Sequence, residues 1–226
     1  MTKTFTTPVT PLEFNGSARP LLFQLPRHQT YVETRGSVGA KLFAKPRSRV
    51  EVLNDRDGAA VNLSRVLINQ ETRLRVLTRY AASLNSHRIV PFQRDDGVAR
   101  AAQFASEIVR ATSKMPASSY RIPRRFPIEL ERRLQPLDHA LDRLRKVQLE
   151  DHSSLDLLGR YDWSQAFFLC DERTTIWESD DGCALAKQLN TVRGKVALIV
   201  DERPDWISKA PRWKQMTNAD KTWVNY

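Results

Sequence analysis

The chain has 226 residues, of which 41% are hydrophobic and 27% charged, so it is long enough to bury a core and its composition is that of a globular protein. It has no apolar run near the roughly 18 to 20 residues that cross a bilayer, and no signal-peptide core at the N-terminus. These features, with only two cysteines, favour a cytoplasmic protein without a disulfide framework.

The net charge of +10 is unevenly distributed along the chain. Residues 1–150 carry 26 Lys/Arg against 14 Asp/Glu, whereas residues 151–226 carry 10 against 12. Arginine supplies 26 of the 36 basic residues, and its planar guanidinium binds phosphate through two hydrogen bonds. The excess therefore favours a polyanionic partner, although a genome rich in G and C would also raise the arginine content.

The first 60 residues predict extended, turn-rich structure, because five prolines exclude long helices. Short strands are predicted at Leu21–Gln24, Tyr31–Thr34, Ala40–Phe43 and Val50–Leu53. Residues 45–49 (KPRSR) then form the tip of a hairpin or a basic loop. Cations alternate from Lys41 to Arg49, and along an extended chain they would face the same way, so residues 41–49 predict a surface that follows a nucleic-acid strand.

The middle of the chain predicts three helices. Leucines recur at helical spacing over residues 61–85, with arginines on the opposite face. Residues 98–113 also have an apolar face and a polar face at helical spacing. Residues 112–127 contain three prolines and predict an exposed loop. A heptad-like leucine series over 130–144 is interrupted by Pro136, which favours ordinary core packing over a coiled coil.

After Glu150 the composition becomes more acidic and aromatic. Strands are predicted at 165–170, 174–177 and 195–200, and a short helix at 183–190. The resulting fold class is α+β, with a strand-rich N-terminal segment, a three-helix middle section and a small strand-containing C-terminal section. Residues 1–150 are predicted to form a basic nucleic-acid-binding region and 151–226 a smaller section, in the same domain or a separate one.

Several catalytic classes lack their motifs. No phosphate-binding G-x-x-x-x-G-K-[ST], no G-x-G-x-x-G and no G-x-S-x-G occurs, and the histidines and cysteines lack zinc-site spacing, so no cofactor or metal is predicted. Acidic residues between 171 and 202 leave open a metal-dependent nuclease. A metal-independent RNA-processing endonuclease is also open, using His28 or His87 with Tyr31 or Tyr120 as the acid–base pair.

Basic residues interleaved with aromatics are the most specific positive signal, because such segments bind phosphates and stack on bases. The predicted nucleic-acid contacts are Lys41, Lys45, Arg47, Arg49, Arg65, Arg73, Arg75, Arg79, Lys114, Tyr120, Arg121, Arg124, Arg125, Phe126, Arg132, Arg133, Arg143, Arg145 and Lys146. No helix-turn-helix, zinc finger, RNP1 or GXXG signature is present, which favours RNA or single-stranded DNA over duplex DNA.

The sequence therefore predicts a non-enzymatic RNA- or DNA-binding protein. Exposed prolines, extended basic segments and a tryptophan-rich tail suggest a subunit of a larger nucleoprotein complex with protein partners, such as a guide-RNA effector or a viral or mobile-element assembly. The alternatives from other classes are the endonuclease above and a coat protein that neutralises a genome.

Overall fold

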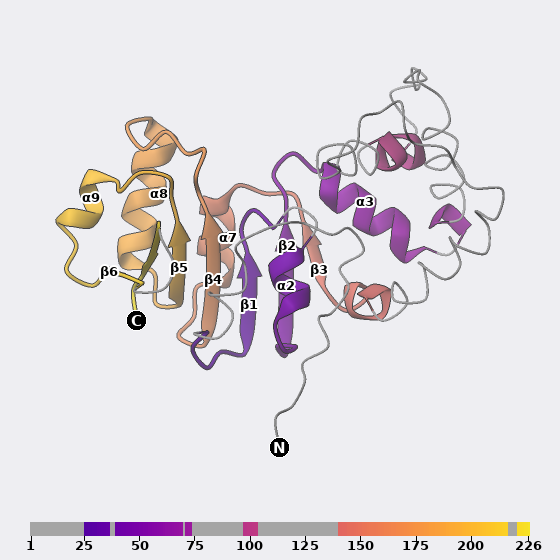
Figure 1. The fold of residues 1–226 in the computed structure, drawn as a ribbon, viewed down its shortest axis with the longest axis horizontal. Helices are drawn as coiled ribbons and strands as arrows, with labels where there is room; N and C mark the ends of the chain where they lie inside the picture. The colour runs from indigo at the N-terminus through magenta and orange to yellow at the C-terminus, as the bar shows by residue number, and fades with distance from the viewer. Residues whose placement is uncertain (1–24, 37–38, 70, 74–96, 104–139, 217–220) are drawn as a thin grey trace, which may run out of the picture. The chain divides into compact units, whose positions relative to one another are not determined.

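The computed structural model describes residues 25–36, 39–69, 71–73, 97–103, 140–216 and 221–226 (Figure 1). The chain divides into two compact units. The first contains the described residues between Asp57 and Lys146. The second contains those up to Arg56 together with Val147–Tyr226, and it includes the whole of the sheet.

The second unit is built on a seven-stranded sheet with the order β3-β2-β1-β4-β5-β7-β6 among the described residues. The first five strands in this order are parallel, whereas β7 is antiparallel to both of its neighbours. The strands are β1 (Thr30–Glu33), β2 (Val50–Asn54), β3 (Gln148–Glu150), β4 (Ala166–Asp171), β5 (Lys195–Ile199), β6 (Lys214–Gln215) and β7 (Thr222–Val224).

Four helices accompany the sheet in this unit: α2 (Ala40–Ala44), α7 (Ser154–Tyr161), α8 (Asp180–Thr191) and α9 (Asp205–Ser208). The connection from β1 to β2 and the connection from β4 to β5 run in opposite directions across the sheet. Because parallel crossovers are right-handed, the two connections place their helices on opposite faces, with α2 on one face and α8 on the other (Figure 1). The unit is thus a doubly wound sheet covered on both sides.

The core lies where these helices cover the parallel strands. The central strand β4 (AFFLCD) is buried along nearly its whole length, which is typical of a parallel strand packed on both faces. On one face, Phe168 and Val196 pack with Leu157 and Leu189 from α7 and α8. On the other face, the rings of Tyr31 and Phe167 stack with their centroids 5.9 Å apart.

The first unit is helical where it is described. Helix α3 (Ala59–Ile68) begins after Gly58, whose φ of 69° favours glycine, and buries Val61 and Leu67. Residues 97–103 and 140–144 are also helical. The Asn62 side chain donates a hydrogen bond of 2.9 Å to the Gly97 carbonyl and joins two of these segments.

The predicted mixture of helices and strands in an α+β chain is confirmed by this architecture. The strands predicted near 31–34, 50–53, 165–170 and 195–200 and the helix near 183–190 are present as β1, β2, β4, β5 and α8. Helix α3 and the helical residues 71–73, 97–103 and 140–144 overlap the three predicted helices. The remainder of those helices, the strand at 21–24 and the whole of the loop at 112–127 lie outside the described residues.

Two predicted strands are wrong. Residues 40–44 form α2, and residues 174–177 lie in the irregular connection between β4 and α8. Because residues 40–44 are helical, residues 45–49 are not the tip of a hairpin between strands at 40–43 and 50–53; they form the alternative that was predicted, a basic loop, which leads from α2 to β2. The extended conformation predicted for residues 41–49 is therefore wrong as well.

Candidate functional site

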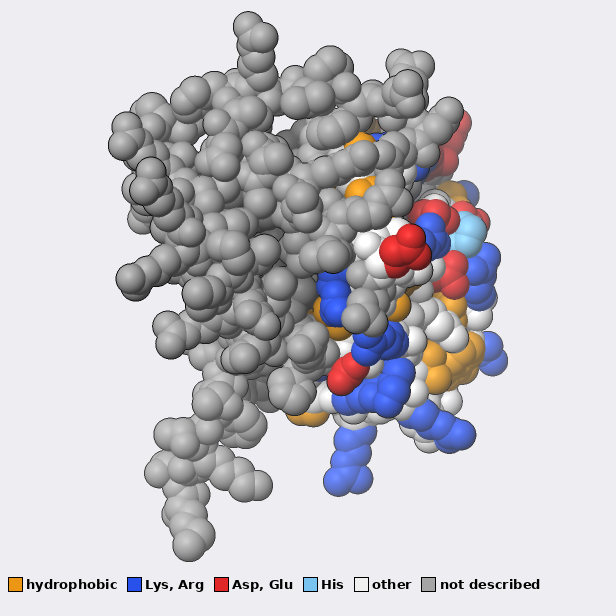
Figure 2. Space-filling model, turned by 90° about the vertical axis from the view of Figure 1, so that its right-hand side faces the viewer, with side chains coloured by type: hydrophobic (Ala, Val, Ile, Leu, Met, Phe, Trp, Pro, Cys, Tyr) orange, Lys and Arg blue, Asp and Glu red, His pale blue; other side chains and the backbone are white. Residues whose placement is uncertain are grey.

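The two ends of the parallel sheet differ in the charges that they carry. Acidic side chains follow the strands at the carboxyl edge, as in Glu33, Asp171 and Asp201. Basic side chains precede the strands at the amino edge, and Figure 2 shows Lys and Arg side chains at the lower margin of the described part, where the parallel strands begin in Figure 1. The unit therefore offers two chemically distinct candidate surfaces.

The strand order reverses between β1 and β4, which marks a topological switch point at the carboxyl edge. Ligands of open α/β sheets bind in the crevice outside the strands at such a point. The turn that leaves β1 contains Gly36 and Gly39. A Cβ on Gly36 would lie 2.1 Å from Leu53 Cδ1 and 2.7 Å from the Glu33 carboxylate, so a larger residue there would displace these side chains.

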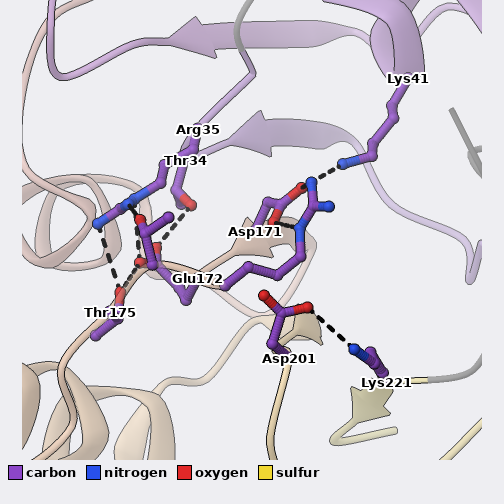
Figure 3. A network of polar contacts seen from close by, with 10 residues as sticks. Thr34, Arg35, Lys41, Asp171, Glu172, Thr175, Asp201 and Lys221 are labelled. Atoms are coloured by element: carbon purple, nitrogen blue, oxygen red, sulfur yellow. Dashed lines mark hydrogen bonds and ion pairs between the residues drawn. The ribbon is translucent and has the colours of Figure 1, made fainter. Parts of the chain in front are cut away.

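Glu172 organises the carboxyl edge beside the switch point (Figure 3). It is 1% exposed, and it follows β4 directly. Its carboxylate accepts hydrogen bonds from Ser154 Oγ at 2.5 Å and Thr175 Oγ1 at 2.6 Å, and it forms an ion pair with Arg35 at 3.1 Å. A third hydroxyl, that of Thr34, donates at 3.3 Å. Glu172 thus ties the ends of β1 and β4 to the start of α7.

Asp171 and Asp201 are also paired with cations (Figure 3). Asp171 accepts two hydrogen bonds from Arg173, at 2.7 and 2.8 Å, and one from Lys41 at 3.0 Å. Burial acts to raise the pKa of Asp171, but these hydrogen bonds leave that pKa below its usual value. Asp201 pairs with Lys221 at 3.2 Å. The carboxylates of Asp171 and Asp201 are therefore paired with cations from the same chain.

A pocket of about 260 Å³ opens at this edge, around the end of β4 and the starts of α7 and α8. Its lining is mostly polar and consists of Arg35, Arg56, Ser153, Ser154, Leu155, Glu172, Thr174, Thr175, Ile176, Ser179, Asp181, Gly182 and Leu185. Ser153 and Ser179 accept hydrogen bonds from the backbone amides in the first turns of α7 and α8. The described residues contain no group of three His, Cys, Asp or Glu side chains that could hold a metal ion.

The amino edge carries five basic side chains, which we call the amino-edge cluster: Arg27, Arg47, Arg49, Arg193 and Lys195. They precede β1, β2 and β5 or begin them, and the order of these strands spreads them over three strand spacings, or about 14 Å. The Lys195 ammonium donates to the Arg27 carbonyl at 3.1 Å. This spread suits an extended polyanion better than a single phosphate.

Few acidic groups neutralise the amino-edge cluster. Arg193 pairs with Asp162 at 3.6 Å but stays 72% exposed. Among the described residues, no ion pair involves Arg27, Arg47 or Arg49, and all three are exposed. Unpaired arginines at a surface keep their full charge for a partner.

The predicted contacts divide into several groups in the structure. Arg47 and Arg49 belong to the amino-edge cluster. Lys41 pairs with Asp171 at the opposite edge. Lys45, 3% exposed, forms a buried ion pair with Glu51 at 2.6 Å, so its role as an exposed phosphate contact is corrected.

Five of the predicted cations belong to the first unit. Arg65 is exposed on α3, Arg73 and Arg143 are half-buried, Arg145 pairs with Asp142, and Lys146 is exposed. The other predicted contacts lie outside the described residues: Arg75, Arg79, Lys114, Tyr120, Arg121, Arg124, Arg125, Phe126, Arg132 and Arg133.

Three members of the amino-edge cluster, Arg27, Arg193 and Lys195, were missed by the sequence analysis. Each directly precedes or begins a strand that was itself predicted, but isolated basic residues at strand starts carry no motif. Only the parallel pairing of β1, β2 and β5 in one sheet brings the strand starts to the same edge.

The histidine proposed for a ribonuclease lies beneath this cluster. His28 Nδ1 lies 2.6 Å from the Pro26 carbonyl and Nε2 lies 2.9 Å from Ser48 Oγ, so both ring nitrogens are bonded within the chain. Burial lowers the pKa of His28. Its suggested partner Tyr31 is fully buried and donates to Glu33 at 2.6 Å. This pair is therefore not arranged for acid–base catalysis; His87 and Tyr120 lie outside the described residues.

None of the described helices is both long and apolar enough to cross a membrane. Comparison of the chain with models of protein families and with curated protein sequences gives no match.

Proposed function

We propose that this protein binds nucleic acid without catalysing a reaction on it, and that the amino-edge cluster holds the phosphate backbone. The observation that carries the proposal is that three exposed arginines at one edge of the sheet, Arg27, Arg47 and Arg49, have no acidic partner among the described residues. Guanidinium groups at such a surface release counterions from a phosphate backbone when they bind it.

The position of the cluster at the strand starts favours contacts with the nucleic-acid backbone over reading of the bases. Loops that precede strands supply these cations, and none of the five members lies on a helix that could enter a major groove. We therefore expect RNA or single-stranded DNA to bind with little sequence preference, and the protein to act within a larger nucleoprotein complex in the cytoplasm.

The proposal is tested by measuring the fluorescence anisotropy of labelled single-stranded RNA, single-stranded DNA and duplex DNA with the full chain. Binding should weaken steeply between about 50 and 200 mM salt, with a slope of log K against log salt of about −3.5 if all five cations contact a single strand. A flat response, or no binding at low salt, contradicts the proposal. Cleavage of the RNA in EDTA supports the endonuclease instead, and large homo-oligomers support a coat protein.

A second candidate function is binding of a nucleoside or nucleotide at the carboxyl edge. The observation that favours it is the topological switch point between β1 and β4, beside which lie the glycine turn at Gly36 and the pocket of about 260 Å³. We test this function by measuring the melting temperature of the protein with each of a panel of free nucleosides and nucleotides. A rise in melting temperature that Arg56→Ala reduces supports this site, and no rise with any member contradicts it.

A further inference from the structure

The loop from α2 to β2 alternates exposed arginines with a buried serine. Arg47 and Arg49 are exposed, whereas Ser48 between them is 8% exposed. Ser48 Oγ lies 2.8 Å from Lys45 Nζ and 2.9 Å from His28 Nε2. The Ser48 backbone amide donates to Glu51 Oε1 at 3.0 Å. The loop is therefore fastened at its centre, from both its side chain and its backbone.

Each hydrogen bond around Ser48 has one donor and one acceptor, and together these bonds form a network. A lysine ammonium only donates, so Ser48 Oγ accepts from Lys45 and its own hydrogen is left for His28 Nε2. That nitrogen can accept, because the short contact from Nδ1 to the Pro26 carbonyl requires the proton on Nδ1. The Lys45 ammonium also donates hydrogen bonds to Glu51 Oε1 at 2.6 Å and to the Pro46 carbonyl at 3.0 Å.

The ion pair between Lys45 and Glu51, which supports this hydrogen-bond network, is buried. The Lys45 and Glu51 side chains are 1% and 2% exposed, and the Lys45 ammonium also lies 4.1 Å from the centre of the Tyr31 ring. Removing one member of a buried ion pair leaves an uncompensated charge in the interior. Separating Lys45 from Glu51 is therefore costly in free energy. The Lys45–Glu51 ion pair therefore gives Ser48 a buried hydrogen-bond partner.

We propose that Ser48 is a positioning residue, which holds Arg47 and Arg49 in place for phosphate through its bonds to Lys45, His28 and Glu51. This inference rests on the nucleic-acid-binding function proposed above. When an arginine on a mobile loop binds phosphate, both its side chain and the loop lose conformational entropy. A loop that is already held in place loses less entropy on binding, so its arginines bind more tightly. The affinity of the two arginines therefore depends on a side chain that does not touch the ligand.

A double-mutant cycle separates this role from a general loss of structure. Ser48→Ala in the full chain should weaken binding of labelled single-stranded RNA about three- to tenfold, the range expected for lost hydrogen bonds. In the Arg47→Ala/Arg49→Ala background, Ser48→Ala should have no further effect on affinity. An equal loss in both backgrounds shows that Ser48 acts elsewhere and overturns the inference. Ser48→Cys, which is close to serine in size, replaces Ser48→Ala if the alanine variant does not fold.

A second measurement needs no nucleic acid and so distinguishes the failure of this inference from the failure of the proposed function. The ¹⁵N relaxation of the arginine Nε–H groups should report restricted motion for Arg47 and Arg49 in the wild-type chain. Ser48→Ala should increase this motion without changing that of Arg193, which belongs to the same cluster. Equal mobility in both proteins overturns the positioning role, whether or not RNA binds. If these groups are ordered but RNA does not bind, the anchor remains and the nucleic-acid function is wrong.

Discussion

Glu33 shows how burial sets the chemistry of a single residue in this protein. It ends β1, is 2% exposed and accepts a hydrogen bond from Tyr31. Burial raises the pKa of Glu33 from 4.5 to about 7, although Lys41, Tyr31 and Lys45 act in the opposite direction. The native state therefore binds this proton more tightly than the unfolded chain does.

This shift predicts a loss of stability as the pH rises. The contribution of Glu33 is fully present below pH 4.5 and is lost as the pH rises through about 7, because the folded protein must then bury a charged carboxylate. The difference between the two pKa values corresponds to about 3 kcal/mol in the free energy of unfolding. Glu33→Gln cannot titrate, so this part of the pH dependence should disappear from its denaturation curves.

The matched control for this measurement is Glu178→Gln, at an exposed carboxylate. It should keep the pH dependence of the wild type. If Glu33→Gln and the wild type lose equal stability between about pH 5 and pH 8, the proton is not bound at Glu33.

The sequence singled out several of the residues at these sites, but it did not predict the contacts that their side chains make. Glu172 and Asp171 stood out in the sequence as candidate metal ligands, and only the structure shows their carboxylates bonded to hydroxyls and cations from other elements (Figure 3). Lys45 was predicted to be an exposed cation because basic residues alternate from Lys41 to Arg49. Its partner Glu51 is six residues away, and no local rule pairs them.

At the scale of single elements, α8 is fixed by a close contact at its first turn. A Cβ on Gly182 would lie 2.2 Å from the Ile176 carbonyl oxygen and 2.7 Å from Trp177 Cα, both of which are backbone atoms. Backbone gives way less easily than a flexible side chain, so Gly182→Ala must shift the helix or the preceding segment. We expect it to lower the free energy of unfolding by about 2 kcal/mol or more.

Gly159 in α7 is the matched control for this substitution. It is also helical, but a Cβ there meets no atom within 4 Å. Gly159→Ala should raise the free energy of unfolding by about 0.5 to 1 kcal/mol, because alanine loses less entropy in a helix. Urea denaturation of both variants gives the comparison, and equal effects of the two substitutions would show that the contact at Gly182 is not restrictive.

Elements with strong patterns were predictable from the sequence, and short ones were not. The strands β4 and β5 are continuous apolar runs, which only a buried strand or a long helix explains. Helix α2 has five residues, too few to show a period, and its alanines and phenylalanine fit a strand equally well. Helix α7 was missed, although Ser153 and Asp156 form the capping pattern that marks a helix start.

At the scale of the whole molecule, the sheet joins strands that are distant in sequence. Strand β3 pairs with β2 in parallel, although the first unit lies between them in the chain. The reversal between β1 and β4, and hence the switch point, arises because β1 pairs with β2 on one side and with β4 on the other. Periodicity cannot predict the order of parallel strands, so the sequence predicted several of the elements, with Arg47 and Arg49 as contacts, but not the edge at which the strand starts meet.

The parallel pairing of β2, β1, β4 and β5 brings the starts of these strands to one edge of the sheet and their ends to the other. Basic residues at the strand starts meet at one edge and carboxylates at the other, while each residue alone resembles an ordinary solvated charge. If the amino-edge cluster binds phosphates, the rest of the positive surface should matter less than these few positions. Nonspecific attraction by the net charge of +10 would instead make all exposed cations equivalent.

The most direct test compares two triple variants in the salt dependence of single-stranded RNA binding. Arg27→Ala/Arg47→Ala/Arg49→Ala should flatten the slope of log K against log salt by about 2, since each lost contact removes about 0.7. Lys187→Ala/Lys209→Ala/Lys214→Ala removes the same charge from exposed positions outside the cluster and should leave the slope nearly unchanged. Both proteins should melt close to the wild type. Equal slopes in the two variants would contradict nucleic-acid binding at the amino edge.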